Sequence, residues 1–156
     1  MIYDLLDALN YENIYLIVNW GVVPFWFLLI LAPYSGFTNF FLQSIIATLL
    51  LTFAYGFVAY KIFLSGNIFD GFELYSGLDG LYSMFSDEAF LLIFWIHFLS
   101  ISLFIGSWIA RDSMKYNISR ILVCLSLVFT YFTGPVGLVF YWFIRIFFSK
   151  KINFND

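Results

Sequence analysis

Four long runs of apolar residues, each about the length of a bilayer crossing, dominate the pattern along this chain. A helix needs about 20 apolar residues to cross the hydrocarbon core of a membrane. The expected spans are Ile14–Ala32, Asn39–Tyr60, Ala89–Ala110 and Ile118–Phe148. The last run is longer than one crossing needs and contains Gly134-Pro135, where the missing backbone donor of proline predicts a kink. The pattern therefore predicts an all-α integral membrane fold, a four-transmembrane-helix bundle with a kinked fourth helix, forming a single membrane domain over residues 1–156.

The segment between the second and third runs has a different composition. Four glycines and five acidic residues lie between Ser65 and Glu88, interleaved with aromatic and aliphatic residues. This mixture favours a segment that lies on the membrane surface. Its end, Ser86-Asp87-Glu88, is typical of an N-cap and an acidic first turn, and so predicts the start of the third helix.

Composition and charge support the membrane class and exclude several functions. Of the 156 residues, 63% are hydrophobic and 11% are charged, whereas soluble domains contain roughly 25% charged residues. The single cysteine, Cys124, excludes an intramolecular disulfide and a cysteine-based metal cluster. No basic cluster indicates nucleic acid, and no catalytic or nucleotide-binding motif implies a cofactor, so we expect neither a cofactor nor a metal. Four basic residues on one side of the membrane against three on the other leave the orientation open.

His97 is the only histidine of the chain, and it lies inside the third run. Ionisable groups at lipid depth are costly and rare unless they face a partner, a cavity or a ligand. An imidazole also titrates near neutrality, which suits it to acid–base chemistry. We therefore expect His97 to be the catalytic residue and to border an internal cavity. The alternatives are a histidine bonded to a neighbouring helix or one that lies near the headgroups.

The fourth run carries a stripe of small and polar residues along one helical face. Spacings of three and four residues bring together Ser126, Thr130, Thr133, Gly134, Gly137, Tyr141 and Arg145. Lipid offers no partners for hydroxyl groups. We therefore expect Ser126, Thr130, Thr133, Gly137 and Tyr141 to face the bundle interior, where they line a cavity or pack against the third helix.

Several ordered motifs carry a family resemblance that covers most of the chain. They are Asn19 with Pro24-Phe25-Trp26 and the stretch to Pro33, then Leu81–Ser86 leading into Trp95-Ile96-His97, then Leu103–Asp112 with Gly106-Ser107-Trp108, and finally Gly134–Tyr141 with Arg145. This set resembles the abscisic-acid-deficient-four-like family, which is known for neoxanthin synthesis in plants and is also found in bacteria. The resemblance implies an isomerisation in which an epoxycarotenoid opens its epoxide and loses a proton to give an allene. Such chemistry needs an acid at the epoxide oxygen and a base at the departing hydrogen.

The resemblance and the polar faces together define the expected site. Alongside His97 as the catalytic residue, the expected ligand-binding residues are Asn19, Trp26, Trp95, Ser102, Thr130, Tyr141 and Arg145. The family pattern has an aspartate where this chain has Ser102, which weakens the expectation of the plant-type reaction. Arg111 and Arg145 are candidates to polarise an end-group oxygen, with a structural role at the membrane edge as the alternative.

Two classes of function stay open at this point. One is an enzyme of carotenoid or related isoprenoid metabolism, and the other is a non-catalytic binder or assembly factor for a carotenoid, quinone or lipid. Transport is a distant third, because four spans in one chain make a small pathway. The expected partners are a lipophilic small molecule and membrane lipid, with a second copy of the chain or another membrane protein as a further candidate. We expect a multi-pass protein of a bacterial inner membrane.

Overall fold

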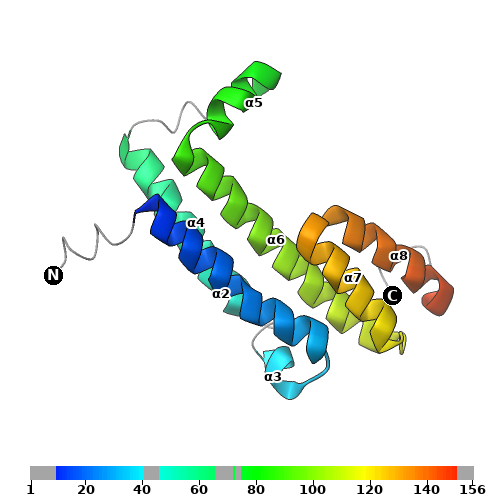
Figure 1. Cartoon of the computed structure of the whole chain (residues 1–156). Helices are drawn as coiled ribbons and strands as arrows, with labels where there is room; N and C mark the ends of the chain where they lie inside the picture. Colours follow the sequence, from blue (N-terminus) through cyan, green and yellow to red (C-terminus); the bar gives the residue numbers. More distant parts are fainter. Residues whose placement is uncertain (1–9, 41–45, 66–71, 73–74, 151–156) are drawn as a thin grey trace. The chain divides into compact units, whose positions relative to one another are not determined.

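The computed structural model describes residues 10–40, 46–65, 72 and 75–150, and the regular elements in these ranges are helices (Figure 1). In chain order they are α2 (Tyr11–Leu31), α3 (Gly36–Thr38), α4 (Ile46–Ser65), α5 (Leu78–Phe85), α6 (Glu88–Lys115), α7 (Arg120–Thr133) and α8 (Pro135–Ser149). The all-α class is confirmed for the described part of the chain.

Three of the helices, α2, α4 and α6, are long and apolar enough to cross a membrane. They correspond to the first three expected spans, although residues 41–45 of the second span lie outside the described residues. The 21 residues of α2 extend for about 32 Å at 1.5 Å per residue, which matches the hydrocarbon core.

The third span begins where the sequence predicts. The Oδ1 atom of Asp87 accepts hydrogen bonds from the backbone N–H of Ala89, at 2.9 Å, and of Phe90, at 3.1 Å. These bonds satisfy two of the donors that a helix leaves free at its start. Glu88 adds an acidic group in the first turn of α6, where the helix dipole favours negative charge. Asp87 therefore acts as the N-cap residue of this span.

The expected fourth span is instead a pair of shorter helices, so the four-helix bundle with a kinked fourth helix is not confirmed. The chain breaks at Gly134-Pro135 as predicted, but Figure 1 shows α8 running back beside α7 rather than continuing it. Gly134 adopts a positive φ of 55° at the reversal, a conformation that favours glycine. The helices have 14 and 15 residues, and about 21–23 Å of helix is too short to cross a core of about 30 Å.

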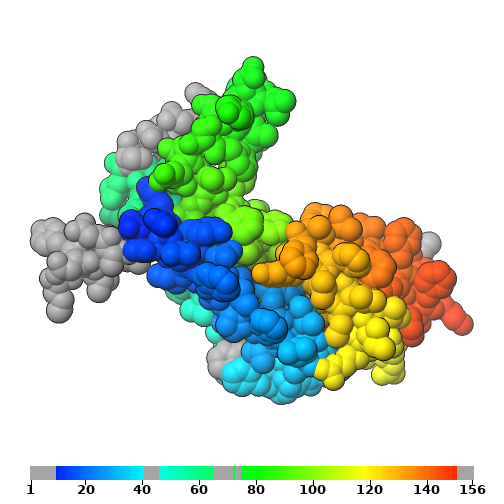
Figure 2. Space-filling model, viewed as in Figure 1, coloured from blue at the N-terminus to red at the C-terminus, as the bar shows by residue number. Residues whose placement is uncertain are grey.

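The residues divide into two compact units. The first combines the chain up to Gly21 with Leu50–Leu99, and the second combines Val22–Leu49 with the chain from Ser100 onward. In the second unit α7 and α8 pack directly against each other, as the yellow to red surface in Figure 2 shows.

Large aromatic side chains stand on the outside of both units. Phe53 of the first unit is 74% exposed, and Phe147 of the second is 81% exposed. A soluble domain rarely presents many such residues, whereas lipid solvates them without cost. The exposed aromatic surface thus agrees with a membrane-embedded chain.

The polar stripe faces inward at four of its five expected positions. Ser126, Thr130 and Tyr141 are fully buried, and Gly137 is buried, but Thr133 is exposed. The expectation for Thr133 is therefore wrong. Its hydroxyl donates to the carbonyl oxygen of Phe129 at 2.7 Å, so this side chain is satisfied within its own helix and needs no partner in the interior.

Gly137 allows the close approach of α8 to α7, and we expect Gly137→Ala to destabilise the protein by about 1–3 kcal/mol or more. A Cβ atom at this position would overlap the backbone nitrogen and the hydroxyl of Thr130. Gly21→Ala is the matched control, because nothing lies within 4 Å of a Cβ there. Thermal unfolding in detergent micelles measures the difference, and equal midpoints for the two variants would contradict the close packing of the hairpin.

Candidate functional site

His97 lies on α6 in the first unit and is exposed. It borders an open groove of about 270 Å³ whose other walls are Tyr55, Phe90, Ile93 and Phe94. The imidazole and the Tyr55 ring are neighbours, with ring centroids 6.4 Å apart and planes tilted by 52°. The groove is therefore apolar, with one imidazole and one phenol as its polar groups. The expectation of an internal cavity at His97 is corrected to an open groove on the outside of the unit.

The depth of His97 along α6 follows from helix geometry. It lies nine residues after Glu88, the first residue of α6, which corresponds to about 14 Å along the axis at 1.5 Å per residue. A helix of 28 residues is about 42 Å long, so this position falls inside a hydrocarbon core of about 30 Å. An exposed imidazole at this depth meets lipid and whatever is dissolved in it.

Trp95 and Asn19 are also in the first unit, but they do not join His97 at its groove. The Trp95 indole stacks on Phe98, with centroids 5.6 Å apart, and lies 6.4 Å from the Tyr15 ring of α2. Trp95 and His97 are two positions apart on one helix, so their side chains point about 200° apart. Asn19 is half-buried on α2.

Trp26, Ser102 and Thr130 are buried in the second unit. Trp26 packs its six-membered ring on Gly106, where a Cβ would lie 2.8 Å from the indole Cη2 atom. The missing side chain of Gly106 thus lets the Trp26 ring approach the backbone of α6 closely.

The hydroxyl of Thr130 does not point to a ligand site. It donates to the carbonyl oxygen of Ser126 at 2.8 Å, and Ser126 in turn donates to the carbonyl oxygen of Leu122 at 2.9 Å. Such bonds to the carbonyl four residues earlier satisfy hydroxyl groups inside a single helix. These side chains are therefore inward-facing but already engaged with their own backbone.

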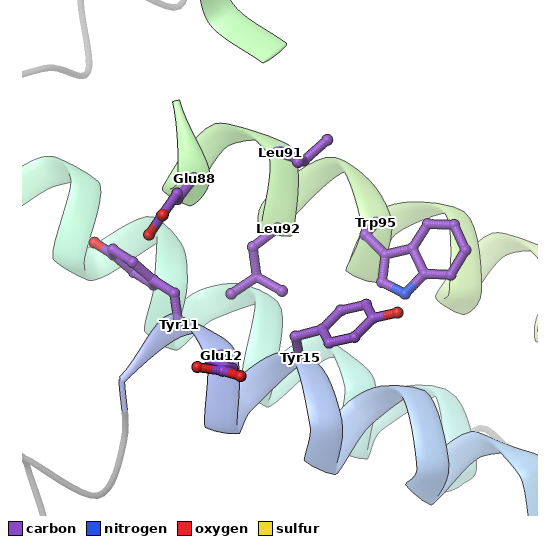
Figure 3. Close-up of a pocket in the computed structure, with 7 residues that line it drawn as sticks. All are labelled: Tyr11, Glu12, Tyr15, Glu88, Leu91, Leu92 and Trp95. Atoms are coloured by element: carbon purple, nitrogen blue, oxygen red, sulfur yellow. The ribbon is translucent and has the colours of Figure 1, made fainter. Parts of the chain in front are cut away.

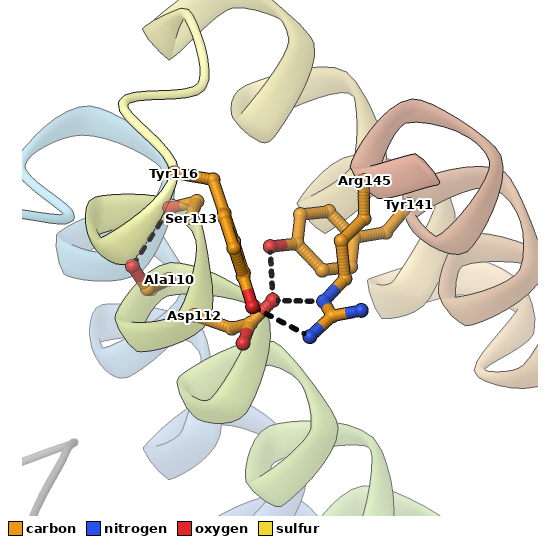
Figure 4. A network of polar contacts seen from close by, with 6 residues as sticks. All are labelled: Ala110, Asp112, Ser113, Tyr116, Tyr141 and Arg145. Carbon is orange, nitrogen blue, oxygen red and sulfur yellow. Dashed lines mark hydrogen bonds and ion pairs between the residues drawn. The ribbon is translucent and has the colours of Figure 1, made fainter. Parts of the chain in front are cut away.

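Among the described residues, the most buried charges form a network around Asp112 in the second unit (Figure 4). The Oδ2 atom of Asp112 accepts a hydrogen bond from the Tyr141 hydroxyl and forms an ion pair with the Arg145 Nε atom, both at 2.8 Å. Arg145 also donates through Nη2 to the Tyr116 hydroxyl at 3.0 Å, and its guanidinium lies 4.8 Å from the centre of that ring. Tyr141 and Arg145 are fully buried, and Asp112 is 5% exposed.

Local geometry explains how the chain assembles this network. Tyr141 and Arg145 are four residues apart on α8, so their side chains share one face. Asp112 and Tyr116 show the same spacing at the end of α6. A buried ion is tolerated only when its charge is compensated and its donors are satisfied. The network meets both conditions and fixes α8 against the end of α6.

Of the expected site residues, the structure brings Tyr141 and Arg145 together. Sequence analysis missed their partners, Asp112 and Tyr116, as members of a site. One signal was present in the sequence: Asp112 is the sole acidic residue between Glu88 and Asp156, and a buried arginine needs a carboxylate. Arg111, the other candidate for polarising an oxygen, is exposed.

We expect Asp112→Asn to lower stability by about 3–5 kcal/mol, because it leaves the guanidinium of Arg145 buried without a counter-charge. Arg145→Lys keeps the charge but loses the fork that reaches both Asp112 and Tyr116, so it should also destabilise. Arg111→Gln is the control, since this arginine is exposed and should change stability by less than about 0.5 kcal/mol. Unfolding midpoints in detergent test this, and a wild-type midpoint for Asp112→Asn would contradict a stabilising ion pair.

Comparisons with known proteins agree with the motifs. The sequence profile of the family described as ABA DEFICIENT 4-like matches residues 13–141, most of the chain. A relative from Arabidopsis thaliana, named Protein ABA DEFICIENT 4, chloroplastic, is 27% identical over 132 residues. That alignment covers 82% of this chain and 58% of the relative, so the chain spans somewhat more than half of the relative's length. No solved structure matches the chain.

These comparisons bear on the membrane in which the protein resides and on the family to which it belongs. The relative is named chloroplastic, so the expectation of a bacterial inner membrane is not supported, whereas the apolar helices do fit a membrane protein. The family profile covers the motifs around Trp26, His97 and Gly134. The chain belongs to the ABA DEFICIENT 4-like family.

Proposed function

We propose that this chain binds an oxygenated carotenoid or a related isoprenoid from the bilayer and isomerises it at His97. The observation that carries the proposal is the pairing of His97 with Tyr55 in an apolar groove on the outside of the first unit. A substrate dissolved in lipid reaches such a groove by lateral diffusion, without leaving the membrane. Membership of the ABA DEFICIENT 4-like family supports this choice of substrate class, through the reaction that the family resemblance implies.

The size and lining of the groove suit the end group of a long apolar molecule. A volume of about 270 Å³ lies just below the range of roughly 300–1,000 Å³ that is typical of small-molecule sites. It accommodates a substituted ring, while a conjugated chain attached to that ring stays among the lipid tails. The aromatic walls, Phe90 and Phe94, offer flat surfaces for such a ring.

The implied reaction needs one acid and one base, and the groove supplies two proton-carrying groups. The Tyr55 phenol donates its proton to the epoxide oxygen as the carbon–oxygen bond breaks. The His97 imidazole takes the proton from the neighbouring carbon, and the electron pair of that carbon–hydrogen bond forms the new double bond of the allene. Return of the proton from the imidazolium to the phenolate restores both residues. The net change is an isomerisation that consumes no co-reactant.

A non-catalytic binder is the second candidate function, and Ser102 is the residue that favours it. Ser102 is 3% exposed in the second unit, at the position where the family pattern has an aspartate. If the family's reaction depends on that carboxylate, this chain keeps the ligand but lacks the base. The chain would then hold a carotenoid, quinone or lipid for a partner protein.

We expect His97→Gln to abolish isomerisation of an added epoxycarotenoid while the protein still folds and binds pigment. Glutamine keeps much of the size and the hydrogen-bonding capacity of histidine but cannot exchange a proton near neutrality. Tyr55→Phe should lower the rate by roughly a hundredfold or more, as expected for loss of a general acid. Chromatographic separation of the pigment isomers gives the rate. Full activity of His97→Gln would exclude the catalytic role.

Ser102→Asp separates the enzyme from the binder. If the native chain already isomerises the substrate, the new carboxylate adds little and lowers stability, because an unpaired charge in a buried position is costly. If the native chain is inactive, a gain of isomerisation in Ser102→Asp but not in the matched Ser102→Asn variant would show that the chain lacks only the carboxylate for the reaction. An inactive native chain with no gain in Ser102→Asp would overturn the enzyme proposal in favour of the binder.

A further inference from the structure

A second cavity, open to the outside, lies in the first unit between the first two turns of α2 and α6 (Figure 3). Its volume is about 480 Å³, larger than the groove at His97. Figure 3 shows Glu88 beside Tyr11 at one end and the Tyr15 ring beside the Trp95 indole at the other. Glu12 and two leucines complete the lining. The proposed isomerisation uses none of these residues.

The charge of this cavity is negative. Glu12 and Glu88 both line it, and none of the lining residues in the described part of the chain is basic. One aromatic wall already contacts a cation: the Nζ atom of Lys61 lies 5.1 Å from the centre of the Tyr11 ring. The two carboxylates outnumber this one ammonium, so the net charge around the cavity is negative and favours a positively charged group over an anionic one.

The aromatic side chains indicate which class of cation the cavity suits. Tyr11, Tyr15 and Trp95 are three of the seven lining residues, and the centroids of Tyr15 and Trp95 are 6.4 Å apart. A quaternary ammonium has no N–H to donate, so it gains from the faces of aromatic rings and from nearby negative charge. A primary ammonium also lies over ring faces, as Lys61 does, but it is strongly hydrated and so loses more on leaving water. Rings and carboxylates in one cavity thus suit a trimethylammonium group best.

The cavity lies near the boundary between the lipid headgroups and the hydrocarbon core. Both α2 and α6 are long enough to cross the membrane, and the cavity spans the first two turns of each, where Tyr11 and Glu88 begin the two helices. Tyrosine and tryptophan are enriched at this level of a bilayer. We propose that the cavity binds a quaternary ammonium group, as carried by the choline headgroup of a phospholipid or by free choline.

This site is separate from the proposed isomerisation site. Glu88 and Trp95 line the cavity, whereas Phe90 and His97 line the groove, and the two pairs lie on roughly opposite faces of α6 by helix geometry. A failure of headgroup binding therefore leaves the His97 proposal intact, and the reverse also holds.

Native mass spectrometry of the delipidated full chain in mild detergent tests the proposal. The probes are phosphatidylcholine, phosphatidylethanolamine and phosphatidylglycerol with identical acyl chains. We expect phosphatidylcholine to bind at least about fivefold more tightly than the other two. The double variant Glu12→Gln with Glu88→Gln should weaken phosphatidylcholine binding about threefold to tenfold, as should Trp95→Leu. Asp79→Asn is the matched control, because this exposed carboxylate does not line the cavity.

The arms of the experiment give distinct outcomes. Displacement of phosphatidylcholine by millimolar free choline would support the site and identify a soluble source, while binding that choline does not displace would support the lipid source. Equal binding of all three lipids would overturn the proposal. So would wild-type phosphatidylcholine binding by the double glutamine variant, or equal binding of phosphatidylcholine and phosphatidylethanolamine.

Discussion

Lipid offers no hydrogen-bond partners, and this constraint governs the buried polar groups of the described apolar helices. The backbone groups are satisfied by the hydrogen bonds of the helices. The hydroxyls of Ser126 and Thr130 donate to carbonyl oxygens of their own helix. The charge of Arg145 is compensated by the ion pair with Asp112, and its guanidinium donates to the Tyr116 hydroxyl, while Tyr141 donates to Asp112. The apolar side chains face the opposite way without cost, as the exposed Phe147 shows.

The same constraint explains how far the sequence predicts the fold. Long apolar runs predicted four spans, and three of them are helices long enough to cross a membrane, one of which Asp87 caps as expected, because hydropathy and capping are local properties. Gly134-Pro135 predicted a break but not its geometry, since the same dipeptide suits a kink and a reversal, and the choice depends on packing at Gly137. The partnership of Arg145 with Asp112 joins residues 33 positions apart, so helical periodicity within one run does not reveal it.

The ionisable groups of the apolar helices fall into two kinds, which need different explanations. Asp112 and Arg145 are buried and neutralise each other's charge in an ion pair. This pairing gives both residues a structural role. His97 is exposed in an apolar groove beside a tyrosine, and packing alone gives no reason for an imidazole there. This contrast is why the proposed chemistry rests on His97, and why an open groove fits a substrate that travels within the lipid.

The central claim is that this chain binds a carotenoid or a related isoprenoid from the bilayer. The most direct measurement is the visible absorption and the extracted pigment of the full chain, purified in mild detergent from cells that make oxygenated carotenoids. The account predicts a polyene at near-stoichiometric amounts, retained through purification and reduced when Phe94, a wall of the His97 groove, is replaced by alanine. A colourless protein that carries only phospholipid would contradict it.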